Sequence, residues 1–233
     1  MSRTEPIRLD DVASLPAGFA SQLLVFDNVF RAYEHIDSVV ADPRIRPLVA
    51  ELENYLRQRP IRAYHCTREP APGYFAREGL RLTDIQKHQK EFLSAFGNCF
   101  TVTELQDMQT AWRDYFEGTG QTLARNGRLW FCLTEATARS DGTEVFFKHF
   151  GGEAIFMPLK EHPTIAVKLA AIGSPVIVEV QLLPGVTPEH TYFARPLLSA
   201  YHLMRRQDAS PWLSETFIEY PIAPKDILSV TPA

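Results

Sequence analysis

The segment "SPVIVEVQLLPG" constrains the fold more than any other part of the chain. It is rich in β-branched residues and is bounded by Pro175 and Pro184, a composition typical of a buried strand. Four other apolar segments also predict strands: "RPIRAYHCT", "GRLWFCLT", "ETFIEYPI" and "DILSV". The chain must therefore contain a sheet, and its last two strands flank the turn between Pro221 and Pro224.

Helical spacing of apolar residues dominates two other regions. Residues 1–60 predict a helical N-terminal extension packed on the core, and residues 82–126 predict a helical insertion. Within that insertion, Thr103 and Gln106 have the spacing of a capping box. The segment "TEVFFKHFGGEAIF" predicts one more helix. Together these patterns predict an α+β fold whose core domain spans residues 61–233.

Composition excludes several classes of protein. The 233 residues are 45% hydrophobic, which is enough for a sizeable core. The net charge is −4 and the sequence has no run of Lys or Arg, so a general surface for binding duplex nucleic acid is not indicated. Cys66, Cys99 and Cys132 are widely spaced, as in reduced thiols rather than a disulfide framework or zinc site. No apolar signal segment and no run near the roughly 18 residues of a membrane span is found. We expect a soluble cytoplasmic protein without membrane or metal partners.

The segment "AYHCTREPAPGYFAREGLRL" holds the first candidate site residues. His65 ends a predicted strand and is followed by Cys66, Thr67 and Arg68, then by a proline-containing loop and a one-turn helix. Gly79 stands where a C-cap glycine ends such a helix. A histidine at the end of a strand is more often structural than ligand-binding, so this segment by itself leaves both roles open.

This segment resembles the first motif of the ADP-ribosyltransferase superfamily, in its diphtheria-toxin-like and poly(ADP-ribose) polymerase-like branch. That motif has a histidine, a small residue, Ser or Thr, often Arg, a variable loop and a helix ending in Gly-Leu-Arg. The matching residues here are His65, Thr67, Arg68, Gly79, Leu80 and Arg81.

Later segments follow in the order of the same family. "NGRLWFCLT" places Trp130, followed by Phe131, where the family has a strand with a tyrosine. "VIVEVQLLPG" is similar to the next strand, and "SETFIEYPIAPKDILSV" is similar to the last, with Glu215 in the place of the catalytic glutamate. The resemblance covers much of the chain from residue 63 onward. It does not cover the N-terminal helices or the insertion.

The resemblance implies a split mixed or antiparallel sheet and NAD as substrate. Cleavage of the nicotinamide–ribose bond passes through an oxocarbenium-like sugar, as in glycoside hydrolysis. In the implied roles, Glu215 stabilises the developing positive charge and His65 hydrogen-bonds the adenosine ribose. Backbone groups of Cys66, assisted by Thr67, hold the nicotinamide amide, and the Trp130 ring stacks on nicotinamide. The implied catalytic residues are Glu215 and His65, and the implied cofactor-binding residues are His65, Cys66, Thr67, Arg68, Trp130 and Phe131.

Three secondary candidates remain, and Trp130 fits an ordinary buried strand residue equally well. Glu219 alternates with Glu215 along the predicted strand, so the pattern does not choose between them. "EYPIAP" also resembles the "EVLIPP" of the arginine-modifying toxin branch, although the Ser-Thr-Ser motif of that branch is missing. His149 and Glu153 have i, i+4 spacing, but no third ligand predicts a metal site. Glu153 is instead a candidate to assist an acceptor.

Four functions remain open. The first is an NAD-dependent ADP-ribosyltransferase that modifies a protein or nucleic acid, or an NAD glycohydrolase; a bacterial toxin or defence role fits its compact size by analogy. The second is an inactive nucleotide- or partner-binding module on the same fold. The third is an RNA 2′-phosphotransferase-like enzyme. The sequence lacks the cluster of basic residues that such an enzyme has around its site. The fourth is an interaction module that recruits a protein partner through the aromatic N-terminal helices.

Overall fold

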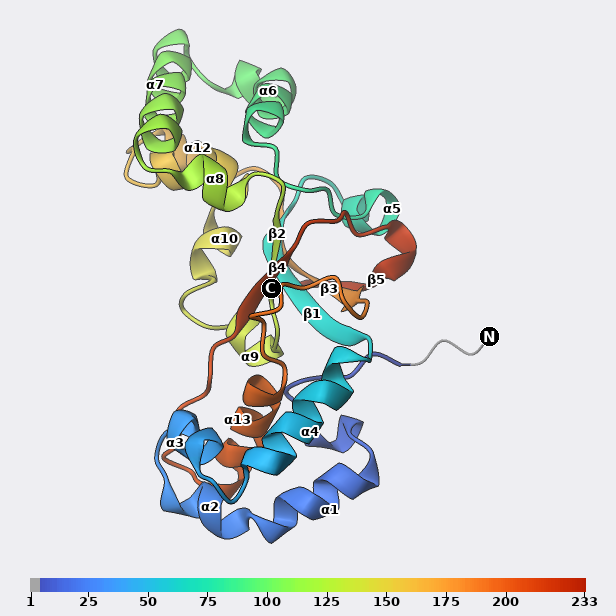
Figure 1. The fold of residues 1–233 in the computed structure, drawn as a ribbon. Helices are drawn as coiled ribbons and strands as arrows, with labels where there is room; N and C mark the ends of the chain where they lie inside the picture. Colours follow the sequence, from blue (N-terminus) through green and yellow to red (C-terminus); the bar gives the residue numbers. More distant parts are fainter. Residues whose placement is uncertain (1–4) are drawn as a thin grey trace. The chain divides into compact units, whose positions relative to one another are not determined.

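The strands form one five-stranded sheet in the order β4-β2-β1-β3-β5 (Figure 1). We describe the fold from a computed structural model that covers residues 5–233. The strands are β1 (Ile61–Glu69), β2 (Leu129–Cys132), β3 (Ser174–Leu182), β4 (Glu215–Ile218) and β5 (Ile227–Pro232). β1 and β2 are antiparallel, with Tyr64 opposite Cys132. The α+β class is confirmed, and the predicted division of the sheet into two halves stays a prediction.

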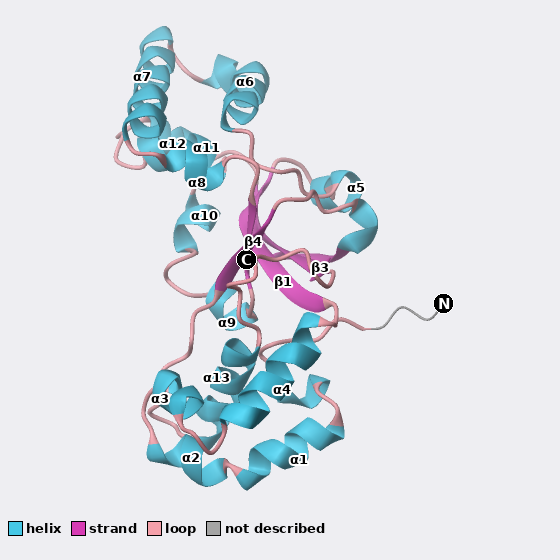
Figure 2. Cartoon of the chain, in the orientation of Figure 1, coloured by secondary structure: helices cyan, strands magenta, loops and turns pink. Residues whose placement is uncertain are grey.

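Helices account for most of the remaining regular structure (Figure 2). Before β1 they are α1 (Ala17–Val25), α2 (Asp27–Ala32), α3 (Ile36–Ala41) and α4 (Arg46–Arg57). Between β1 and β2 they are α5 (Tyr74–Glu78), α6 (Ile85–Phe96), α7 (Val102–Gly118) and α8 (Gln121–Arg125). After β2 they are α9 (Glu135–Ala138), α10 (Glu144–Lys148), α11 (Gly152–Ile155), α12 (Ile165–Ala170) and α13 (Ala194–Arg205). None of the helices within residues 5–233 has the length and apolar character needed to cross a bilayer.

Two helical predictions were wrong in detail. The capping box of α7 joins Thr101 and Glu104, not Thr103 and Gln106, because the Thr101 hydroxyl accepts from the Glu104 amide and the Glu104 carboxylate accepts from the Thr101 amide. The segment 143–156 is two short helices, α10 and α11, because Gly151 and Gly152 adopt left-handed backbone conformations with φ of 94° and 55°.

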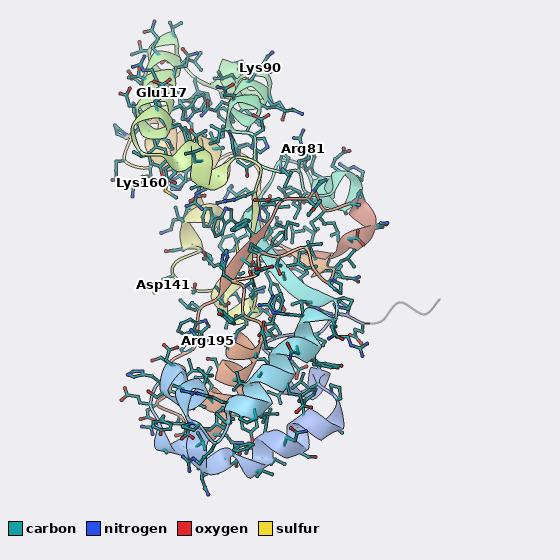
Figure 3. The ribbon with its side chains drawn as sticks, in the orientation of Figure 1. Arg81, Lys90, Glu117, Asp141, Lys160 and Arg195 are labelled. Atoms are coloured by element: carbon teal, nitrogen blue, oxygen red, sulfur yellow. The ribbon has the colours of Figure 1, made fainter. Side chains whose placement is uncertain are left out.

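The chain divides into two compact units. The first comprises the chain up to Tyr64 together with Phe131–Ser140 and Glu179–Phe217. Its helices pack around α13, which contacts α2, α3 and α4 (Figure 1). Arg195, labelled in Figure 3, lies on α13 with its guanidinium 4.7 Å from the centre of the Trp212 ring. The predicted domain boundary between residues 60 and 61 stays a prediction.

The second unit comprises His65–Trp130, Asp141–Val178 and Ile218–Ala233, and it holds the helical insertion. Its hydrophobic core gathers side chains from α6, α7, α11 and α12, with Phe92 and Trp112 near its centre. The Trp112 indole donates to the Ile155 carbonyl at 2.8 Å, so its polar atom is satisfied within the core. Lys168 of α12 forms a 2.6 Å ion pair with Glu104 and so joins α12 to the capped start of α7.

Gly79 ends α5 as predicted, with φ of 73° and its amide donating to the Phe75 carbonyl. The next residue, Leu80, pairs with Ile222 through two backbone hydrogen bonds of 2.9 Å. A Cβ at position 79 would lie 2.1 Å from the Ile222 carbonyl oxygen. Glycine is therefore required both by the backbone conformation and by the close approach of the chain after β4.

We expect Gly79→Ala to lower the free energy of unfolding by about 2–4 kcal/mol, because the new methyl group adds backbone strain and a backbone clash. Urea denaturation measures the change. The matched control is Gly18→Ala on the exposed side of α1, where a Cβ meets nothing within 4 Å. That variant should stay within about 1 kcal/mol of the wild type. Equal stability of the two variants would contradict the role given to Gly79.

Candidate functional site at the β1–β2 junction

His65 is fixed by a hydrogen bond to the neighbouring strand. Its Nδ1 lies 2.9 Å from the Trp130 carbonyl oxygen. A carbonyl can only accept, so Nδ1 carries the proton in this bond and, in the neutral ring, Nε2 is the acceptor nitrogen. The tautomer of His65 is thus set by β2, which is the usual way in which a second hydrogen bond prepares a histidine for a specific role.

The surroundings of His65 favour its neutral form. Burial lowers the pKa of the imidazole below its ordinary value of 6.5, and the hydrogen bond to Trp130 opposes this effect only in part. Desolvation acts in this direction because it penalises the charged form of a base. At neutral pH the residue is therefore a neutral imidazole rather than a cation.

The strand register brings two more predicted residues together. Because Tyr64 lies opposite Cys132 in an antiparallel pair, Cys66 lies opposite Trp130. Cys66 is half-buried and is not part of a disulfide, and Thr67 beside it is also half-buried. Cys66 and Trp130 therefore share one face of the sheet. His65 lies opposite Phe131 on the other face, and it is linked to Trp130 only through the backbone carbonyl of that residue.

Trp130 belongs to a charged cluster that the sequence did not predict. The Arg125 guanidinium lies 5.1 Å from the centre of the Trp130 ring and forms a 2.8 Å ion pair with Glu153. Cation–π contact with an indole is favourable, so Arg125 restrains the ring and at the same time holds Glu153. Arg125 ends α8 and Glu153 lies in α11, and nothing in the local sequence of either residue signals that they meet.

Arg68 is held by a set of backbone carbonyls, and its expected role in binding the cofactor stays a prediction. Its guanidinium donates to four backbone carbonyls: those of Phe147 at 2.6 Å, Ala170 at 2.9 Å, Ile172 at 2.8 Å and Gly173 at 2.7 Å. Three of these carbonyls lie at or just beyond the end of α12, where a cation also meets the negative end of the helix dipole. Four of the five N–H groups of this guanidinium are therefore used within the chain.

The two candidate glutamates differ in their surroundings. Glu215 is the exposed first residue of β4, followed by the buried Thr216. Glu219 is exposed and lies 3.7 Å from the Arg128 guanidinium, an ion pair of little energetic weight at such a surface. Phe131, expected at the cofactor, is only 2% exposed and is a core residue, because period-2 alternation turns it away from the face of Trp130.

His149 and Glu153 do not share a helix, because the chain breaks at the two glycines between them. The His149 ring stacks on Phe156 at 4.0 Å with an interplanar angle of 4°. Burial lowers the pKa of this imidazole, with nearby Arg68 acting in the same direction. Residues 5–233 contain no group of three or more potential ligands that could hold a metal ion.

We expect Arg68→Lys to lower the free energy of unfolding by about 2–4 kcal/mol, because an ammonium cannot reach four carbonyls and some of them lose their partners. Urea denaturation measures the change. The matched control is Arg77→Lys, since Arg77 is exposed and makes a single 3.1 Å bond to the Pro72 carbonyl. A stable Arg68→Lys variant that binds NAD more weakly would support the cofactor role instead.

The lowered pKa of His65 predicts a pH dependence of stability. Between its folded pKa and the unfolded value of 6.5, the unfolded chain binds more protons than the folded one. The contribution of His65 is therefore fully present above pH 6.5 and is lost as the pH falls through the folded pKa. His65→Asn keeps a donor near the Nδ1 position and removes the titration. The unfolding free energy of this variant should therefore fall less than that of the wild type between pH 7.5 and 5, which lie about one unit or more on either side of the unfolded value of 6.5.

The exposed His35 supplies the control for this experiment, as His35→Asn. Denaturation curves of both variants and of the wild type, recorded across the same pH series, isolate the effect of His65 from those of the other histidines. If His65→Asn retains the full pH dependence of the wild type, the assignment of a neutral, buried imidazole to His65 is wrong.

Comparison with known proteins adds no family to this geometry. No protein-family model, curated protein or solved structure matches the chain. The function must therefore be argued from the chemistry of the residues at the β1–β2 junction.

Proposed function

We propose that this protein is an NAD-dependent ADP-ribosyltransferase that releases nicotinamide and passes ADP-ribose to a macromolecular acceptor or to water. The proposal gives His65 and Trp130 the task of holding NAD and Glu215 the task of assisting the chemistry. It rests on the resemblance of four ordered segments to that superfamily and on the chemical state of His65.

The state of His65 carries the proposal. A ribose hydroxyl is a hydrogen-bond donor, and the residue best suited to receive it is a neutral group with an oriented acceptor. The bond from Nδ1 to the Trp130 carbonyl and the lowered pKa together give His65 this character.

The pairing of Cys66 with Trp130 supports the nicotinamide end of the proposal. The resemblance assigns backbone groups of Cys66 to the nicotinamide amide and an aromatic ring on β2 to stacking. An indole has two faces, and Arg125 covers one of them at 5.1 Å from the ring centre. The proposal has nicotinamide stack on this indole, because flat rings add contact area and fix orientation.

The proposed chemistry gives each candidate residue one role. Glu215 begins β4, His65 lies in β1 and Trp130 lies in β2. In the proposed reaction the bond between the anomeric carbon and the nicotinamide nitrogen breaks. Its electron pair leaves with nicotinamide, and the Glu215 carboxylate stabilises the cationic sugar that remains. An acceptor nucleophile then bonds to the anomeric carbon and gives up its proton.

We expect the wild-type protein to release nicotinamide from NAD and Glu215→Gln to reduce the rate by about a hundredfold or more, since a neutral amide cannot stabilise the cationic sugar. Chromatographic measurement of nicotinamide provides the readout. Glu219→Gln is the matched control, because Glu219 is an exposed glutamate four residues along the same segment. Its rate should stay close to that of the wild type.

Four outcomes decide the proposal. Loss of activity in Glu219→Gln with retention in Glu215→Gln would move the catalytic role to Glu219. An NAD-dependent thermal shift without nicotinamide release would identify an inactive nucleotide-binding module. The absence of both, with protein and RNA acceptor mixtures present, would refute the proposal. Loss of a 2′-phosphate from RNA in the presence of NAD would assign the phosphotransferase reaction instead.

A further inference from the structure

A pocket of about 380 Å³ lies in the second unit, between α5, the end of β1 and the last strand. Its wall is formed by Glu69, Gly73, Ala76, Pro224 and residues 227–230. Figure 1 shows α5 beside β5, and the two elements are in contact. This volume is within the range of small-molecule sites, at the lower end of about 300–1,000 Å³. None of the residues assigned to NAD lines this pocket.

Glu69 gives the pocket its chemical character. The residue is 8% exposed, and its Oε1 accepts one hydrogen bond, from the Phe75 amide at 3.2 Å. Within residues 5–233 no Lys, Arg or His forms an ion pair with it. A carboxylate offers about four acceptor positions, and buried charges are normally paired, so Glu69 is incompletely satisfied where it lines the pocket.

The basic residues near the pocket are turned to other partners or to solvent. Arg77, the basic residue of α5, donates to the Pro72 carbonyl at 3.1 Å and is not part of the wall. Lys225, beside the wall residue Pro224, is exposed. The charge of Glu69 is thus left for a group that enters from outside.

The remaining side chains of the wall are apolar apart from one hydroxyl, and backbone groups add polar surface. Ala76, Pro224, Ile227, Leu228 and Val230 supply the apolar surface. The Ser229 hydroxyl oxygen is buried and has no hydrogen-bond partner among the described residues. A ligand that fits this wall has an apolar body and a charged head that donates several hydrogen bonds.

We propose that this pocket binds a small organic monocation, an ammonium or guanidinium head on a short apolar stem, with the head paired to Glu69. An ammonium offers three donors and a guanidinium five, so either can bond the carboxylate and the Ser229 hydroxyl together. The proposal is independent of the reaction assigned to the β1–β2 junction, and its test needs no NAD.

Titration of the ¹⁵N-labelled protein with n-butylammonium and n-butylguanidinium tests the proposal. We expect saturable amide shifts at Gly73, Ala76 and Ser229, with the dissociation constant for n-butanol, which has the same stem, about tenfold or more higher. Glu69→Gln keeps an acceptor for the Phe75 amide and removes the charge. It should weaken binding of both cations by about tenfold, without changing the affinity for n-butanol.

Glu78→Gln is the matched control, because Glu78 is an exposed residue of α5 outside the wall, and its variant should bind both cations as the wild type does. Thermal denaturation confirms that Glu69→Gln is folded. Equal affinity for n-butanol and the cations, shifts that do not saturate at the wall residues, or unchanged cation binding in Glu69→Gln would each overturn the proposal.

Discussion

The four hydrogen bonds of Arg68 are the interaction on which the second unit most depends. They join β1 to carbonyls at the end of α12 and to α10, two helices that follow Arg68 by more than seventy residues in the sequence. Burial lowers the pKa of this guanidinium, yet an arginine stays charged, so each bond is charge-assisted. One side chain thereby joins β1 to α10 and to Gly173, the residue just before β3.

Residues of β1 consequently have different structural roles. His65 bonds β2, Arg68 closes helix ends, and Glu69 lines a pocket against α5. Alternation along a strand makes this division natural, because Arg68 and Glu69 must point to opposite faces of the sheet. A single motif in the sequence therefore carries a candidate ligand contact, a scaffold contact and a second candidate site.

The sequence predicted what depends on local pattern and missed what depends on distant partners. The strands follow from apolar runs, and Gly79 follows from its place after a one-turn helix. The predicted capping box was placed on the wrong pair because Thr103–Gln106 and Thr101–Glu104 have the same spacing. The structure forms the box with Glu104. The pKa of Glu104 is lowered to about 2, chiefly by its hydrogen bond with Lys168, which is sixty-four residues away in the sequence. The contacts of Arg68 and Arg125 are equally non-local, so no pattern around them distinguishes a scaffold contact from a phosphate contact.

The tryptophan at position 130 connects the fold to the proposed chemistry. A phenol would place a hydroxyl beyond the ring, whereas an indole gives a larger surface with its donor on the ring edge. Arg125 uses that larger surface and is itself neutralised by Glu153, so no net charge is added beside the ring. A cationic nicotinamide ring can then approach the indole without meeting an unpaired arginine. In the proposed NAD site, the ion pair between Arg125 and Glu153 is therefore what allows a tryptophan at position 130 to receive a cationic ring.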